Sequence, residues 1–169
     1  MSETPDVMSK GWDAAFRRMC VWTKLYDQQT KVAFFVFCTH FDHMGIKARA
    51  ESAKLVVAKV KTIVGNSPVL VVGDLNSTPD SQEMYKTFTE NLADSRKVSV
   101  IPPKGYLGTF NGYEMSSDSI SAFQLIDYIF CQKVKVLSYK VLRDKYSEGS
   151  YPSDHFPVMI ECEMKRNNP

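Results

Sequence analysis

The spacing of apolar and polar residues along the chain predicts about six strands and two long helices. A polar turn at residues 27–31 separates apolar runs at 20–26 and 32–39, which is typical of an antiparallel hairpin. Apolar residues recur every three or four positions over residues 45–64, and this period predicts a helix. We expect further strands at residues 68–72, 124–131, 134–142 and 156–163, and a second helix capped at Thr78 and running to about Leu92.

The order of these elements indicates the α+β class. Hairpins are mixed with one strand–helix–strand crossover, so parallel and antiparallel pairs should occur in the same sheet. The length of 169 residues fits one domain. We therefore expect a single domain, residues 1–169, with one mixed sheet of about six strands and two main helices.

Charge and cysteine content narrow the class of protein. Lys and Arg number 21 against 19 Asp and Glu, a balance that gives no argument for nucleic-acid binding. No apolar run approaches the roughly 20 residues that cross a bilayer, so we expect no membrane span. None of the cysteines forms a CxxC pair, and we expect reduced thiols, which suit the cytoplasm. The four are Cys20, Cys38, Cys131 and Cys162.

Three groups of polar residues lie where an apolar strand begins or ends, a fourth lies inside a strand, and loops at strand ends often carry catalytic groups. They are residues 39–43 (THFDH), Asp74 with Asn76, Asp127, and residues 153–155 (SDH). Asp127 is the most informative, because a carboxylate inside an apolar strand requires a partner. His155 is a candidate for that partner.

Each of these residues also has an ordinary structural interpretation when it is taken alone. Asp127 can face solvent, Asp74 and Asn76 can form a turn, and His40 can be a hydrogen-bonded structural histidine. His40 and His43 also form an HxxH pair, which together with Asp42 gives a weak zinc hypothesis.

The ordered set of motifs resembles the endonuclease/exonuclease/phosphatase superfamily, whose members include pancreatic deoxyribonuclease. TH at 39–40, GDLN at 73–76, IDY at 126–128 and SDH at 153–155 carry the resemblance. A bacterial subgroup with SETPD, GWDAA, THFDH and ARAESAKL is more similar still. The resemblance implies half of a four-layer α/β/β/α sandwich. The family's N-terminal half, with a metal-binding Glu, lies upstream of the segment matching SETPD, so we expect this chain to lack it.

The resemblance also implies chemical roles. His155, oriented by Asp127, would act as general base or as an electrophilic contact to the phosphoryl oxygens, and Asp74 would position or activate water. Asn76 would bind the phosphate, and His40 would stabilise developing charge or protonate the leaving oxygen. The implied metal ligand is Asp154, for Mg²⁺ or Mn²⁺ bound weakly without the upstream Glu. Arg49, Trp12 and Phe110 are further candidate substrate contacts, although Arg49 can also lie on a solvated helix face and Phe110 can be an ordinary loop anchor.

Two functions from different classes follow from this resemblance. The first is a metal-dependent phosphoesterase, impaired in this chain, whose substrate is a nucleic acid, a phospholipid head group or a sugar phosphate. The second is an inactive fragment that serves as a folded interaction module. A half-sandwich would expose an apolar sheet face, and we expect a homodimer through that face. The localisation is left undecided, because a signal peptide would lie in the upstream part.

Overall fold

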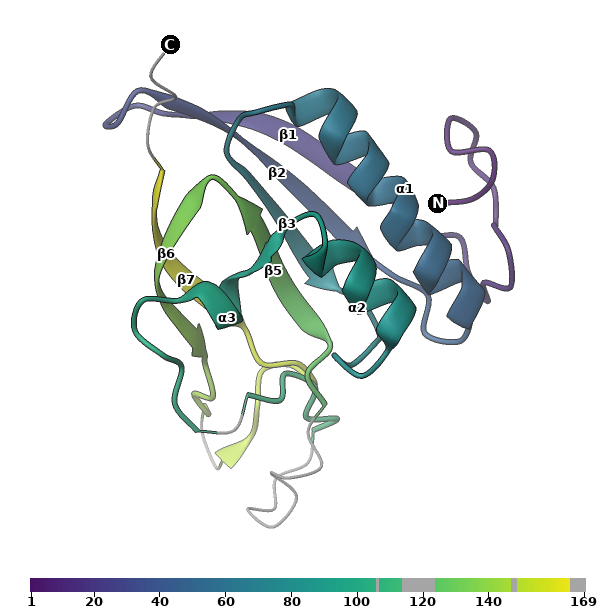
Figure 1. The fold of residues 1–169 in the computed structure, drawn as a ribbon. Coiled ribbons are helices and arrows are strands. Elements are labelled where there is room, and N and C mark those ends of the chain that lie inside the picture. The colour runs from purple at the N-terminus through teal and green to yellow at the C-terminus, as the bar shows by residue number, and fades with distance from the viewer. Residues whose placement is uncertain (106, 114–123, 147–148, 165–169) are drawn as a thin grey trace.

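The computed structural model describes residues 1–105, 107–113, 124–146 and 149–164. In this part of the chain it contains seven strands and three helices, with a strand hairpin near each end of the described chain (Figure 1). The elements are β1 (Cys20–Asp27), β2 (Val32–His40), α1 (Ile46–Val64), β3 (Val69–Asp74), α2 (Gln82–Thr89), β4 (Ala93–Asp94), α3 (Ser95–Val98), β5 (Asp127–Gln132), β6 (Val134–Val141) and β7 (Val158–Met164).

The main sheet has five strands in the order β1-β2-β3-β5-β4. β1 and β2 form the expected antiparallel hairpin, and β2 and β3 are parallel across the α1 crossover. β5 is antiparallel to both β3 and β4. The sheet is therefore mixed, and the α+β class is confirmed.

Helices α1 and α2 lie side by side on one face of this sheet (Figure 1). The core forms there because alternate residues of the central strands, such as Phe37, Val71 and Phe130, point toward the helices and are almost fully buried. Burial of apolar surface at about 25 cal/mol per Å² makes this contact the main source of stability.

The last two strands differ from the expectation of a single sheet. β6 and β7 pair with each other as a separate two-stranded sheet, with an irregular register between Val136 and Ser138. The outer edge of β6 is occupied by residues 100–101, whose backbone N–H groups donate to Val136 and Leu137. The strands themselves were predicted, but their alternating pattern does not specify which sheet they join.

Two helix boundaries also differ from those expected. Residues 78–81 form a turn in which the Ser81 N–H donates to the Thr78 carbonyl, so α2 begins at Gln82 and its N-cap is Ser81 instead of Thr78. The helix ends at Thr89, before Leu92. Among the described residues, no helix is both long and apolar enough to cross a membrane.

Candidate active site

Three polar side chains lie side by side at one end of the main sheet, on adjacent strands. The strand register pairs His40 at the end of β2 with Asp74 at the end of β3, and Asp74 with Asp127 at the start of β5. Paired residues project from the same face of a sheet. Because Phe37 and Val71 point toward the helices three positions earlier, His40 and Asp74 project from the opposite face. We call these three residues the polar row.

His155 completes the cluster from a different part of the chain. Its Nδ1 lies 2.8 Å from Oδ2 of Asp127, and its Nε2 lies 4.0 Å from Oδ2 of Asp74. The Nε2 of His40 lies 3.3 Å from the same Asp74 oxygen, and the His40 side chain is 57% exposed. The structure therefore brings both histidines and both carboxylates together at one place that solvent can reach.

The charges of the cluster shift two pKa values in directions that suit proton transfer. Burial raises the pKa of Asp74, and the neighbouring Asp127 charge adds to this, although the hydrogen bond from Asn76 and both histidines oppose it. Burial works against protonation of His155, but the hydrogen bond and charge of Asp127, followed by the charges of Asp74 and Asp154, outweigh it. The pKa of His155 is therefore raised.

Asn76 fixes the carboxylate of Asp74 from a left-handed backbone conformation (φ 47°). Its N–H donates to Asp74 Oδ1 at 2.7 Å, and its Nδ2 donates to Asp74 Oδ2 at 3.2 Å and to the Phe41 carbonyl at 3.1 Å. Both amide hydrogens are thus used within the protein. The predicted phosphate contact would require Asn76 to exchange one of them for the substrate.

Phe110 contacts the cluster, and Arg49 lies beside the loop that follows β2. The Phe110 ring meets the His155 ring edge-on, with centroids 5.0 Å apart, and so contacts the imidazole itself. The half-buried Arg49 donates from Nη1 to the Asp42 carbonyl at 3.1 Å, while its Nε has no partner among the described residues. Trp12 shares no hydrogen bond or ring contact with the cluster among the described residues, and its backbone N–H donates to the Glu3 carboxylate in the N-terminal segment.

Asp42 is an anchor of the loop after β2, and its position argues against the zinc hypothesis. Its carboxylate, 2% exposed, accepts hydrogen bonds from the backbone N–H groups of Ala15, Phe16, Met44 and Gly45. The His43 ring stacks on Phe16, away from this carboxylate. Sequence reasoning missed this role, although an Asp three residues before a Gly is a signal for a side-chain turn.

Asp154 is the carboxylate that the sequence resemblance implies as a metal ligand. It is half-buried, and its Oδ1 lies 3.4 Å from the Ser153 hydroxyl. Within the described ranges, no group of three or more His, Cys, Asp or Glu is arranged to hold a metal ion. One carboxylate with water and substrate oxygens is a donor set that Mg²⁺ accepts, but it predicts weak binding.

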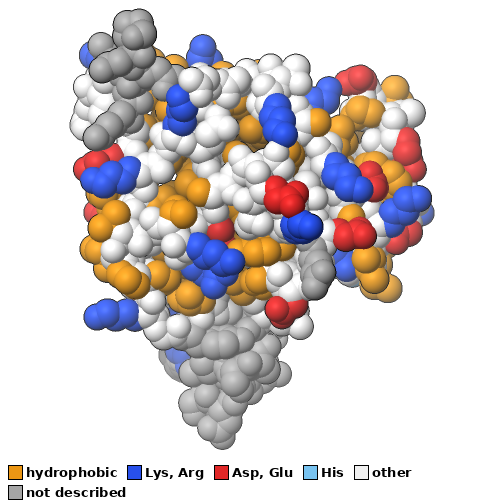
Figure 2. Space-filling model, viewed as in Figure 1, with side chains coloured by type: hydrophobic (Ala, Val, Ile, Leu, Met, Phe, Trp, Pro, Cys, Tyr) orange, Lys and Arg blue, Asp and Glu red, His pale blue; other side chains and the backbone are white. Residues whose placement is uncertain are grey.

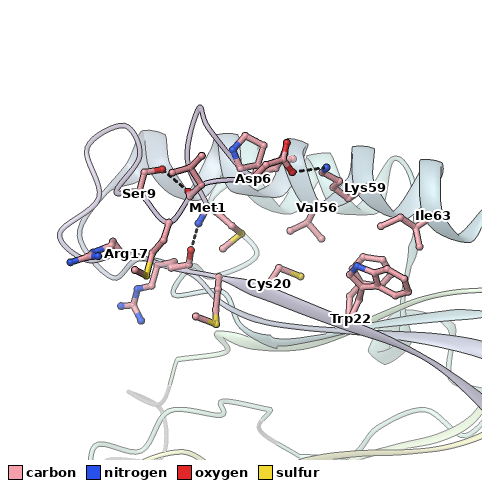
Figure 3. Close-up of a pocket in the computed structure, with 16 residues that line it drawn as sticks. Met1, Asp6, Ser9, Arg17, Cys20, Trp22, Val56, Lys59 and Ile63 are labelled. Carbon is pink, nitrogen blue, oxygen red and sulfur yellow. Dashed lines mark hydrogen bonds and ion pairs between the residues drawn. The ribbon is translucent and has the colours of Figure 1, made fainter.

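A cavity of about 430 Å³ lies elsewhere, between the N-terminal segment, α1 and β1 (Figure 3). Trp22, Phe37 and Val56 form part of its lining. These residues lie on the helix side of the sheet, whereas the polar row projects from the other face. The cavity is therefore separate from the site described above.

Comparison with known proteins identifies the family and its fold. The model of the endonuclease/exonuclease/phosphatase family matches residues 10–155. Among solved structures, a protein of this family from Bacteroides thetaiotaomicron is 40% identical with a TM-score of 0.85, over 95% of this chain and 59% of its own. A mannosyl-6-phosphatase from the same species is 39% identical with a TM-score of 0.87, over 96% and 63%.

A third structure, of a family member from Bacteroides vulgatus, is 35% identical with a TM-score of 0.86, over 97% of this chain and 62% of its own. The chain thus spans about 59–63% of the length of these three relatives. A search of the curated proteins gives no match.

Proposed function

Because the chain belongs to the endonuclease/exonuclease/phosphatase family, we propose that it hydrolyses phosphate esters in a metal-dependent reaction, which is impaired in this chain. The observation that carries the proposal is that the polar row and His155 converge at one place, where the side chains of both histidines are partly exposed. A phosphate ester needs donors for its oxygens, an activated water and a protonated leaving group, and these four side chains can supply them.

His155 is the group that would stabilise charge on the phosphoryl oxygens. Its Nδ1–H donates to Asp127, which orients the ring and leaves Nε2 directed toward Asp74. The raised pKa of His155 favours the protonated ring, which donates to an anionic oxygen. Of the two roles expected for His155, the electrophilic contact is therefore better supported than the general base.

Asp74 is the better candidate for accepting a proton from the attacking water. Its raised pKa brings its basicity closer to what transfer near neutral pH requires, and Asn76 holds both of its oxygens. The exposed His40, 3.3 Å from Asp74, would then protonate the leaving oxygen.

A divalent ion would be held by Asp154 together with substrate oxygens. Members of this family generally use divalent metals, and the hard oxygen donor suits Mg²⁺ or Mn²⁺. When bound, such an ion would neutralise charge on the phosphate. Because the described residues contain no group of three or more His, Cys, Asp or Glu arranged to hold a metal ion, we expect the affinity to be weak.

For the substrate we propose a sugar phosphate. The relative that is 39% identical over 96% of this chain is a mannosyl-6-phosphatase. The formal net charge is only +2, and on the face seen in Figure 2 basic side chains are scattered among acidic ones. That face shows no basic stripe of the kind that would favour a nucleic acid as substrate.

The test is a substrate panel assayed with Mg²⁺ and with Mn²⁺. Mannose 6-phosphate should be hydrolysed faster than bis-p-nitrophenyl phosphate, and His155→Ala should abolish the activity. The variant His43→Ala is the matched control, because His43 stacks on Phe16 outside the cluster and should leave turnover unchanged. Activity that survives in His155→Ala would rule out the proposed site.

A second candidate function is an interaction module, favoured by the face of the main sheet opposite α1 and α2. On this open face, Val21 is 56% exposed and Leu25 is 43% exposed. Phe34, Val36 and Val72 on the neighbouring strands are only half-buried. Exposed apolar side chains gathered on one face are typical of a protein–protein interface. We propose that a second copy of the chain covers it, by a two-fold contact of sheet on sheet.

Sedimentation velocity tests this arrangement. The chain should sediment as a dimer, and Leu25→Glu, which places a charge on the open face, should give a folded monomer. Met44→Glu is the control, since Met44 is 66% exposed in the loop after β2 and should leave the dimer intact. A folded wild-type monomer at high protein concentration would contradict the dimer.

A further inference from the structure

A short segment, residues 109–111, contacts both halves of the His155–Asp127 pair. These two side chains lie 28 residues apart along the chain, so their 2.8 Å approach requires something that holds the start of β5 against the 153–155 loop. Thr109 is fully buried and Asn111 is 2% exposed, although the segment is a loop. Buried polar side chains of this kind are normally fully hydrogen-bonded.

Thr109 binds the strand that carries Asp127. Its Oγ1 accepts hydrogen bonds from the backbone N–H groups of Ile126 at 3.1 Å and Asp127 at 3.0 Å. Its own N–H donates to the Gln124 carbonyl at 2.8 Å. One side chain therefore satisfies two buried donors at the point where β5 begins.

Asn111 and the backbone beside it bind the other partner. The Asn111 N–H donates to the Asp154 carbonyl at 2.7 Å, and its Nδ2 donates to the Ser153 carbonyl at 3.2 Å. The Phe156 N–H donates to the Thr109 carbonyl at 2.6 Å. His155 lies between these anchored residues, with its ring against Phe110.

We propose that Thr109 and Asn111 are positioning residues that set the approach of His155 to Asp127 and keep Asp154 beside it. The effect of this positioning on hydrolysis rests on the proposed function, whereas the positioning itself does not. Displacement of a catalytic group by about 1 Å can reduce turnover about 100-fold. Loss of one of these anchors should therefore lower kcat far more than it changes KM.

The test compares Thr109→Val, which keeps the shape but removes the hydroxyl, with Thr109→Ser, which keeps it. Thr87→Val is the matched control, because the Thr87 hydroxyl bonds only a carbonyl of its own helix, on the surface of α2. Asn111→Asp is a second variant that retains the acceptor for the Tyr113 N–H but removes the donor to Ser153. Circular dichroism establishes that each variant is folded.

The decisive readout is a long-range ¹⁵N–¹H correlation spectrum, recorded at a pH that a titration of the same signals shows to be high enough for the His155 ring, whose pKa is raised, to be neutral. With Asp127 in place, the His155 proton should reside on Nδ1, whereas a ring without a fixed partner shares it between both nitrogens. Folded Thr109→Val or Asn111→Asp should lose the Nδ1 preference and about 100-fold in kcat, with KM within about threefold. Thr109→Ser should restore both.

Each result decides the proposal. An unchanged Nδ1 preference in folded Thr109→Val and Asn111→Asp would overturn it, as would a wild-type ring without that preference. If Thr109→Val does not fold, Asn111→Asp gives the answer. If the wild type shows no hydrolysis, the proposed function fails, and the spectrum alone then decides whether the segment positions His155.

Discussion

Asp42→Asn tests whether the loop that follows the polar row is held by one buried carboxylate. In the wild type, Oδ1 accepts from Ala15, Met44 and Gly45 at 2.8–3.1 Å, and Oδ2 accepts from Phe16 at 3.0 Å. An asparagine side chain keeps one accepting oxygen. Its NH₂ group replaces the other oxygen, so the backbone N–H that donated there loses its acceptor. The substitution therefore weakens several charge-assisted bonds and leaves one donor unsatisfied.

The expected loss of stability is about 3–5 kcal/mol at neutral pH. Hydrogen bonds to a charged group contribute about 1.5–3 kcal/mol each, neutral ones about 0.5–1.5, and an unsatisfied buried donor costs about 1–3. Relaxation of the loop keeps the total below the sum of these figures. Since domains are typically stable by about 5–15 kcal/mol, the variant should still fold.

The difference should also depend on pH, in a direction that identifies the carboxylate. Burial alone would raise the pKa of Asp42, but hydrogen bonds from Gly45, Phe16, Ala15 and Met44 hold that pKa far below its usual range. The unfolded value is about 3.9. The stabilisation is therefore complete above that pH and disappears as pH falls toward the lower, folded pKa.

Urea unfolding monitored by tryptophan fluorescence measures the effect, at pH 7 and at steps down to about pH 3. Asp80→Asn is the control, because Asp80 is exposed, and its loss should stay within about 0.5 kcal/mol. A loss below about 1 kcal/mol in Asp42→Asn, or a loss that does not shrink in acid, would refute this account of the loop.

The central part of the fold could be predicted because its sequence signals are local. β2 and β3 are nearly continuous apolar runs, as expected for strands with both faces partly covered, and α1 shows a clear helical period. α3 and the two-residue β4 were not predicted. Asp94 belongs to both: it is the second residue of β4, and its side chain caps α3 by accepting from the Arg96 N–H. Elements this short show no periodic pattern of apolar residues.

The sequence predicted the four side chains of the candidate site but not the residues that hold them in place. The motifs at strand ends led to His40, Asp74, Asp127 and His155, and the structure brings these four together. Their chemical roles stay predictions. Thr109 escaped notice because a threonine in a Gly-rich loop is typical of a turn. Only the tertiary structure shows that its hydroxyl accepts from β5.

Three further predictions follow from the core and the metal site. Phe88→Ala removes a fully buried ring stacked 4.7 Å from Phe130 and should cost about 3–5 kcal/mol in urea unfolding, whereas Phe16→Ala, at 60% exposure, should cost little. Asp94→Asn should cost about 3 kcal/mol in the same assay, since it removes a buried carboxylate and leaves the half-buried Arg96 without its counter-ion. For Asp154, isothermal titration with Mg²⁺ should give a dissociation constant on the order of millimolar or weaker, because one carboxylate cannot replace the ion's water shell. Added phosphate should tighten Mg²⁺ binding by supplying further oxygen ligands, and Asp154→Asn should abolish that gain. Tight single-site binding without phosphate would contradict the one-carboxylate site.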